Sequence, residues 1–123
     1  MARERPLLGW GYGNYKTFRQ SFYDRYPDAD TTAHAHNDFL QTQVDAGIVG
    51  LAAFVALFVV VLRRGWRGYR GVVAEPARST TLAALLAIVG FLVGGLTQYN
   101  FGDAEVVIYL WFTVALLLRS VAL

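Results

Sequence analysis

The residues best suited to chemistry in this 123-residue chain are His34 and His36, which stand beside Asn37 and Asp38 at the start of a long apolar run. An imidazole changes its charge near neutral pH, so a histidine held in position can take a proton from a hydroxyl group. This chemistry suits activation of a sugar hydroxyl. The sequence therefore indicates His36 as a candidate general base.

Other roles for the same residues stay open. Side chains at alternate positions of an extended strand point to one face, so His34, His36 and Asp38 could bind zinc together, although no convincing fourth ligand follows. Nucleophilic catalysis has little support, because the chain has no cysteine and no serine in an elbow motif. A structural role, in which His36 and Asn37 cap a helix and bond the loop, fits the spacing equally well.

The distribution of charge predicts the elements that hold these residues. Apolar residues make up 55% of the chain and charged residues only 16%, whereas soluble domains carry about a quarter charged residues. Three stretches contain no charge at all: 46–62, 79–102 and 106–118. Uncharged stretches of about 17–25 residues are typical of membrane-spanning helices.

We therefore expect an all-α integral membrane protein in which about three transmembrane helices follow an extracytoplasmic loop segment with a short amphipathic helix. The loop segment covers residues 1–38, and the membrane domain covers residues 39–123. Its spans are expected near 39–62, 80–98 and 106–123. The third can cross only if Arg119 extends to the membrane interface.

Basic residues predict the orientation. The loop between the first two spans carries five arginines against one acidic residue, Glu75, and the loop 97–105 carries Asp103 and Glu105 with no Lys or Arg. Short basic loops remain in the cytoplasm, so residues 1–38 and 97–105 are expected on the outer, periplasmic side. The net charge of +2 reflects the arginine loop and does not indicate a nucleic-acid partner.

The outer segment is rich in glycine and aromatic residues. Residues 8–14 contain three glycines that suit tight turns or close backbone approach, without the spacing of a phosphate-binding loop. Asn14 is expected to cap a short helix that runs to about Tyr26 and stops at Pro27. Its aromatic face is Tyr15, Phe18, Phe22 and Tyr26. That face could anchor in the headgroup region, or stack sugar rings or a prenyl chain with Arg19 or Arg25 near phosphate.

The small and acidic residues within the spans suggest how the spans pack and orient. Gly47 and Gly50 should let the first span pack closely on a neighbour, as Gly90 and Gly94 should for the second. Asp45 is costly in lipid, so it should face protein or water near the outer boundary.

The chain begins with the polar stretch Met1-Ala-Arg-Glu-Arg-Pro and no apolar signal-peptide core follows it, so no cleavable signal peptide is expected. A predicted outer segment with no helix before it favours the interpretation that the chain is the C-terminal part of a longer polytopic protein. Insertion of a short polar N-terminal tail is the other possibility. The remaining helices would then come from the longer chain or from a partner subunit.

Three ordered blocks resemble one known family. His36-Asn37, nine further residues and Gly47-x-x-Gly50-Leu51 form the first. The second runs from Pro6 to Tyr15 (PLLGWGYGNY), and the third from Gln98 to Glu105 (QYNFGDAE). Together they are similar to the O-antigen ligase and polymerase superfamily, which includes lipopolysaccharide ligases and protein O-oligosaccharyltransferases. Ligases and polymerases share these blocks.

The resemblance implies a metal-independent inverting glycosyltransferase without cofactors in the bacterial inner membrane, where it is a multi-pass protein. It would transfer a polysaccharide from an undecaprenyl-pyrophosphate carrier to a hydroxyl of a glycolipid or polysaccharide acceptor. His36 matches the catalytic histidine position. Arg19, Arg25, His34 and Asn37 are the candidate substrate-binding residues, with arginines suited to phosphate, while Asn37 orients His36 or caps the helix.

The resemblance also implies a limit. Members of the superfamily have many more spans than three, and their important loop arginines lie mostly upstream of the matching blocks. The chain alone is therefore expected to be inactive. The alternative from a different class is a small non-catalytic helical membrane protein that packs through its glycines.

Overall fold

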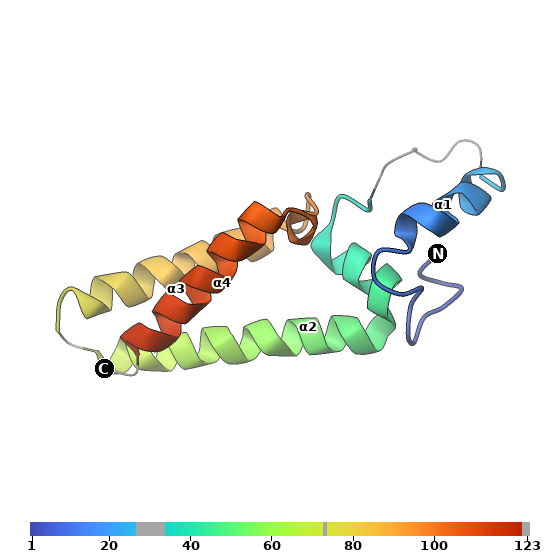
Figure 1. The fold of residues 1–123 in the computed structure, drawn as a ribbon. Coiled ribbons are helices and arrows are strands. Elements are labelled where there is room, and N and C mark those ends of the chain that lie inside the picture. Colours follow the sequence, from blue (N-terminus) through green and yellow to red (C-terminus); the bar gives the residue numbers. More distant parts are fainter. Residues whose placement is uncertain (27–33, 73, 122–123) are drawn as a thin grey trace. The chain divides into compact units, whose positions relative to one another are not determined.

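The computed structural model describes residues 1–26, 34–72 and 74–121, and the chain divides into two compact units. Unit 1 comprises Met1–Val55 and Gly95–Tyr99, and unit 2 comprises Ala56–Gly94 and Asn100–Leu123. The regular elements of the described residues are helices (Figure 1): α1 (Tyr15–Tyr23), α2 (Asp38–Gly71), α3 (Ala77–Gly94), the 3-10 helix η1 (Asn100–Gly102) and α4 (Ala104–Ser120). The expected all-helical class is confirmed for this part of the chain.

Two helices, α2 and α3, are long and apolar enough to cross a membrane, with mean hydropathies of 2.5 and 1.7. Only 28% of the apolar window of α2 and 22% of that of α3 is buried within the chain. A core helix of a soluble protein would bury most of such a window. The exposed apolar faces therefore indicate a membrane protein, in which lipid or further helices cover them.

The third expected span is not confirmed. Helix α4 has 17 residues, which extend about 25 Å at 1.5 Å per residue, less than the roughly 30 Å hydrocarbon core. It begins two residues before the predicted start, because Asp103 caps it: the Asp103 carboxylate accepts a hydrogen bond from the Glu105 backbone N–H at 3.0 Å. Whether α4 crosses stays a prediction.

Unit 2 is held together by tight contacts among its helices. Ile88 of α3 and Leu117 of α4 are fully buried, and the Thr81 hydroxyl of α3 donates to the Ser120 hydroxyl of α4 at 2.8 Å. A Cβ on Gly65 of α2 would lie only 2.7 Å from a Leu117 methyl group. Close packing within the described chain therefore occurs at Gly65, whereas a Cβ on Gly90 would meet nothing within 4 Å. The expectation for Gly90 has no support here.

Helix α1 is shorter than expected and is capped differently. It ends at Tyr23 rather than near Tyr26, and the expected stop at Pro27 lies outside the described residues. Asn14 holds the N-cap position, but its side chain makes no cap bond and donates instead to the Trp10 carbonyl oxygen at 3.0 Å. The Trp10 ring packs on Phe18 and Phe22, at centroid distances of 4.8 and 5.7 Å. Two members of the expected aromatic face, Phe18 and Phe22, therefore pack against the glycine-rich turns before α1.

Helix α2 is interrupted at Gly47, which has φ 66° and ψ −168°. The break lies within the expected first span, near 39–62. Gly47 does allow close packing, as expected, but the neighbour is the backbone of Leu7 and Leu8 and not another helix. The interruption is the feature that organises unit 1.

Candidate active site

The interruption of α2 is filled by residues 6–11, which we term the N-terminal segment. In an unbroken helix the carbonyls of Val44 and Asp45 would accept from the N–H groups four residues later. Here the N-terminal segment supplies the missing hydrogen-bond partners on both sides of the break. The four bonds are Trp10 N–H to Val44 O (2.8 Å), Gly11 N–H to Asp45 O (2.8 Å), Ile48 N–H to Pro6 O (2.7 Å) and Val49 N–H to Leu7 O (3.4 Å).

Two glycines make this close approach possible. Gly9 has φ 68°, and a Cβ there would lie 2.6 Å from the Asp45 carbonyl. A Cβ on Gly47, also at positive φ, would overlap the Leu7 carbonyl oxygen. Neither site accepts a larger residue without moving backbone. The Pro6–Tyr15 block and the Gly47 block of the sequence are therefore two halves of one structural feature.

A buried polar pair links this feature to the histidines. Gln41 and Asp45 are 3% and 6% exposed, and the Gln41 amide nitrogen donates to both Asp45 carboxylate oxygens, at 3.0 and 3.1 Å. The amide oxygen of Gln41 accepts from the backbone N–H of Ala35 at 3.0 Å. The expectation that Asp45 faces protein is confirmed, and Ala35 is fixed between the two histidines.

Residues 95–99, which we term the strap, run antiparallel to residues 34–38 within unit 1. Contacts occur in matched order along both segments, with the sequence numbers rising in one as they fall in the other. They are Asp38 N–H to Gly95 O (2.7 Å), Asn37 Nδ2 to Leu96 O (2.7 Å), His36 Nδ1 with Gln98 Oε1 (3.3 Å) and the His34 ring with the Tyr99 ring (5.3 Å between centroids).

His36 has an unusual backbone. Its φ of 45° makes it the one non-glycine residue with positive φ among those the structure describes. Such a conformation costs of order 1–3 kcal/mol and persists only where the surroundings enforce it. The strap lies on one side of His36, and α2 begins on the other. Asn37 caps the start of α2, since its Oδ1 accepts from the Leu40 backbone N–H at 2.9 Å. The His36 ring is exposed and lies 4.3 Å from that of His34.

Two groups near His36, His34 and Tyr99, have shifted pKa values. Burial lowers the pKa of His34 below 6.5, with His36 and Lys16 adding to the effect, so His34 is neutral at neutral pH. Burial also raises the pKa of Tyr99 to about 12, with Tyr12 contributing next. The Tyr99 hydroxyl therefore keeps its proton under ordinary conditions.

The alternating geometry expected for a metal site is not formed. His36 has a left-handed backbone, and Asp38 lies in the first turn of α2, so the three side chains do not share a strand face. The described residues contain no group of three or more His, Asp or Glu placed to hold a metal ion.

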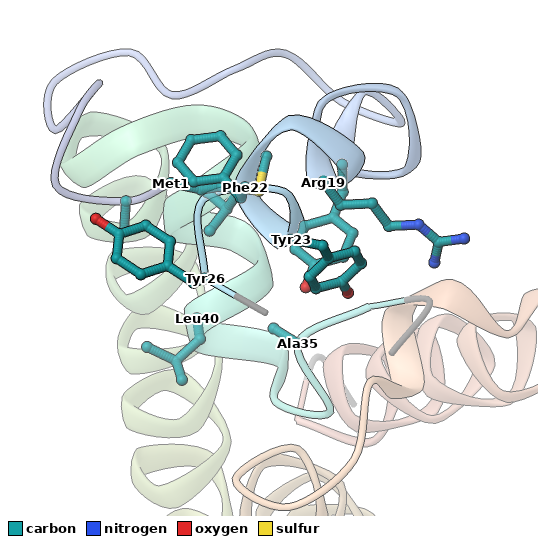
Figure 2. Close-up of a pocket in the computed structure, with 10 residues that line it drawn as sticks. Met1, Arg19, Phe22, Tyr23, Tyr26, Ala35 and Leu40 are labelled. Carbon is teal, nitrogen blue, oxygen red and sulfur yellow. The ribbon is translucent and has the colours of Figure 1, made fainter. Parts of the chain in front are cut away.

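The candidate arginines lie in two different environments. Arg19 lines a cavity of about 360 Å³ together with Phe22, Tyr23 and Leu40. Ala35, which separates the histidines, also lines it, and Figure 2 shows the Arg19 side chain extending from α1 beside Tyr23. Arg25 does not line this cavity.

Arg25 is instead engaged at the surface. Its guanidinium forms an exposed ion pair with Glu4 at 3.4 Å and lies 4.7 Å from the centre of the Phe22 ring. The structure thus brings His34, His36 and Asn37 together, places Arg19 at a neighbouring cavity and leaves Arg25 apart.

Sequence reasoning missed two residues of this site. Gln98 contacts the His36 ring, and Gln41 positions Ala35. Gln98 opens the third block of the family resemblance, which was the available signal for it. Gln41 had no signal beyond being polar beside an apolar run.

Comparison with known proteins supports the resemblance over the same region. The family model described as O-antigen ligase matches residues 1–55, which include α1, both histidines, the interruption at Gly47 and all of unit 1 except the strap. No curated protein gives a significant match, and no solved structure does. Residues 1–55 are therefore similar to the O-antigen ligase family, and the two apolar helices α2 and α3 indicate a membrane protein.

Proposed function

We propose that this chain is the C-terminal part of a membrane glycosyltransferase that transfers a polysaccharide from undecaprenyl pyrophosphate to an acceptor hydroxyl. The observation that carries the proposal is the placement of His36. An exposed imidazole with a strained backbone stands at the start of α2, inside the region that matches the O-antigen ligase family. Strain of this kind is often retained where a side chain performs chemistry.

In this mechanism His36 is the general base. Nε2 takes the proton of the acceptor hydroxyl while the hydroxyl oxygen attacks the anomeric carbon of the carrier-linked sugar. The bond from that carbon to the phosphate oxygen breaks, and undecaprenyl pyrophosphate leaves with the bonding electrons. Attack from the opposite face inverts the anomeric centre, and His36 then releases its proton to water.

Substrate contacts come from the neighbouring residues. Arg19, which lines the cavity, would bind phosphate oxygens, because its guanidinium group stays charged and can donate two parallel hydrogen bonds to them. His34 and Asn37 would contact the sugars, although the Asn37 amide already bonds Leu96 and Leu40. Arg25 would serve only after leaving its exposed pair with Glu4, which is worth little in water.

The membrane arrangement belongs to the same proposal. Residues 1–38 and 97–105 lie on the periplasmic side of the bacterial inner membrane, and α4 completes a third crossing. The arginines after the first span lie in the cytoplasm. Polymerase activity within the same superfamily is the second candidate, since the matched family blocks do not separate it from ligation.

The experiment is a chromosomal His36→Ala substitution in the native protein, with a tag after Leu123 to follow its membrane level. We expect glycan transfer in native membranes to fall by roughly 10²–10⁴-fold at an unchanged protein level. Glu105→Gln, an exposed change in unit 2, is the matched control and should leave transfer unchanged. Full transfer by His36→Ala would overturn the proposal, and loss of the protein itself would favour the non-catalytic alternative.

The same proposal predicts that the isolated 123 residues are inactive, because further helices must supply the pyrophosphate-binding arginines. Measurable transfer by the purified chain would contradict this part.

A further inference from the structure

We infer that Gln98 is a positioning residue for His36, which holds the imidazole in the tautomer whose Nε2 can accept a proton. The inference rests on the proposed role of His36 as base. It concerns the strap, which the family match to residues 1–55 does not cover.

The geometry at the strap supports this role. Gln98 Oε1 lies 3.3 Å from His36 Nδ1. Two backbone-anchored contacts fix the register beside it: Asp38 N–H to Gly95 O and Asn37 Nδ2 to Leu96 O, both at 2.7 Å. The strap cannot slide without breaking these bonds. Gln98 is therefore held opposite His36 by its neighbours rather than by its own single contact.

The chemistry requires such a partner. A neutral imidazole carries one N–H and one lone pair, and the partner of one nitrogen decides the state of the other. When Nδ1 carries the hydrogen, it donates to the Gln98 carbonyl oxygen, and the basic lone pair is on Nε2. A histidine in water prefers the opposite arrangement, with hydrogen on Nε2, which would leave the acceptor hydroxyl facing a nitrogen that cannot take its proton.

Gln98 differs from the carboxylate that performs this task in hydrolase triads. The amide is neutral, so it selects a tautomer without favouring the charged imidazolium. The other titratable groups here are His34, whose ring lies 4.3 Å from His36, Tyr99 of the strap against His34, and Lys16 of α1, whose charge acts on His34. Asp38 follows in the first turn of α2.

Nitrogen NMR tests the inference directly, because the chain has only two histidines. The full chain is labelled with ¹⁵N-histidine in lipid nanodiscs, and the His34→Gln variant leaves His36 as the one remaining signal. We expect neutral His36 to carry its hydrogen on Nδ1. Gln98→Leu should move it to Nε2, and Gln98→Glu, which keeps an acceptor oxygen, should return it to Nδ1. Hydrogen on Nε2 in the parent chain, or no change in Gln98→Leu, overturns the inference.

Activity of the full protein in native membranes gives a second readout. Gln98→Leu should lower kcat about several-fold with little change in KM, because fewer His36 rings then present a free lone pair on Nε2, while substrate binding is unaffected. Gln98→Glu should retain kcat, because its carboxylate oxygen still accepts the hydrogen of His36 Nδ1. Unchanged kcat in Gln98→Leu overturns the inference.

The two hypotheses fail separately. Full activity of His36→Ala removes the catalytic role of His36 and leaves the NMR result standing as structure alone. Inactive His36→Ala together with unaltered tautomer and kcat in Gln98→Leu removes the role of Gln98 and leaves the proposed function intact.

Discussion

Asn37 donates a hydrogen bond through Nδ2 to the carbonyl oxygen of Leu96 at 2.7 Å, although the two residues are 59 positions apart in the sequence. The same amide accepts the Leu40 backbone N–H through Oδ1, which caps α2. One side chain therefore starts the helix that follows His36 and ties that start to the strap.

Asn37→Ala should reduce the stability of unit 1, because the α2 cap and the strap bond are both lost. We expect the free energy of unfolding to fall by about 1.5–3 kcal/mol, from about 0.5–2 for the cap and about 1 for the hydrogen bond. Asn37→Asp keeps the cap acceptor and removes only the donor, so it should lose less. Denaturant unfolding in detergent measures both, and equal losses would show that the cap contributes nothing.

Gly47→Ala should displace the N-terminal segment from α2. Its Cβ would overlap the Leu7 carbonyl oxygen, and its φ of 66° disfavours any L side chain by about 1–3 kcal/mol. Limited proteolysis should then cut within residues 6–11 much faster than in the parent protein. Gly71→Ala is the matched control, since a Cβ there meets nothing within 4 Å. A cleavage pattern identical to that of the control would argue against the filled interruption.

Lys16→Gln should raise the pKa of His34 toward 6.5, because one of the positive charges that lower it is removed. Proton-detected NMR titration of the two histidines measures this shift. Arg70→Gln, at the far end of α2, is the control for removing a charge elsewhere. A His34 titration that is the same in both variants would rule out the effect of Lys16.

The lowered pKa of His34 also has a consequence for stability. The unfolded chain binds a proton at His34 near pH 6.5, while the folded chain binds it only at lower pH. Between these two values the unfolded state carries more protons, so stability rises with pH and levels off above about 6.5. The pH dependence of the melting temperature should be weaker in His34→Gln. An equally steep dependence in that variant would assign it to another group.

The hydroxyl pair of Thr81 and Ser120 should couple α3 to α4. The hydrogen bond is buried and measures 2.8 Å. In a double-mutant cycle with Thr81→Ala and Ser120→Ala, the coupling energy should be about 0.6 kcal/mol and at most about 1.7, as for hydrogen bonds between membrane helices. Additive single losses would show that the two hydroxyls act only through their bonds to Ala77 and Leu117 carbonyls.

The proposed topology can be tested cleanly, because the chain has no native cysteine. In intact cells a membrane-impermeant maleimide should label Asp103→Cys and should spare Glu75→Cys and Arg119→Cys until the membrane is opened. Labelling of Arg119→Cys in intact cells would mean that α4 does not cross. Labelling of Glu75→Cys would reverse the proposed orientation.

Composition and motif order predicted several features correctly from sequence. Uncharged stretches placed α2 and α3 because a long run without charge has few alternatives to an apolar helix. The cost of an acid in lipid predicted that Asp45 would face protein or water, and its side chain is buried against protein. These are local properties, decided by the residues themselves and their immediate neighbours.

Features that depend on contacts between segments distant in the sequence could not be predicted from the sequence. Gly47 looks in sequence like a packing glycine. It becomes a helix break only because the carbonyls of Pro6 and Leu7 accept from the Ile48 and Val49 N–H groups just after it. Asn14 is a residue type that often caps helices, yet its side chain donates a hydrogen bond to the Trp10 carbonyl oxygen instead.

The sequence by itself thus determined that this is an apolar helical chain with an imidazole where its first long helix begins, and that residues 1–55 resemble the O-antigen ligase family. Only the tertiary structure decided how that imidazole is held. Hydrogen bonds between distant segments, such as Asn37 with Leu96 and His36 with Gln98, depend on backbone register. Register is set by many contacts together, and no single residue type or spacing encodes it.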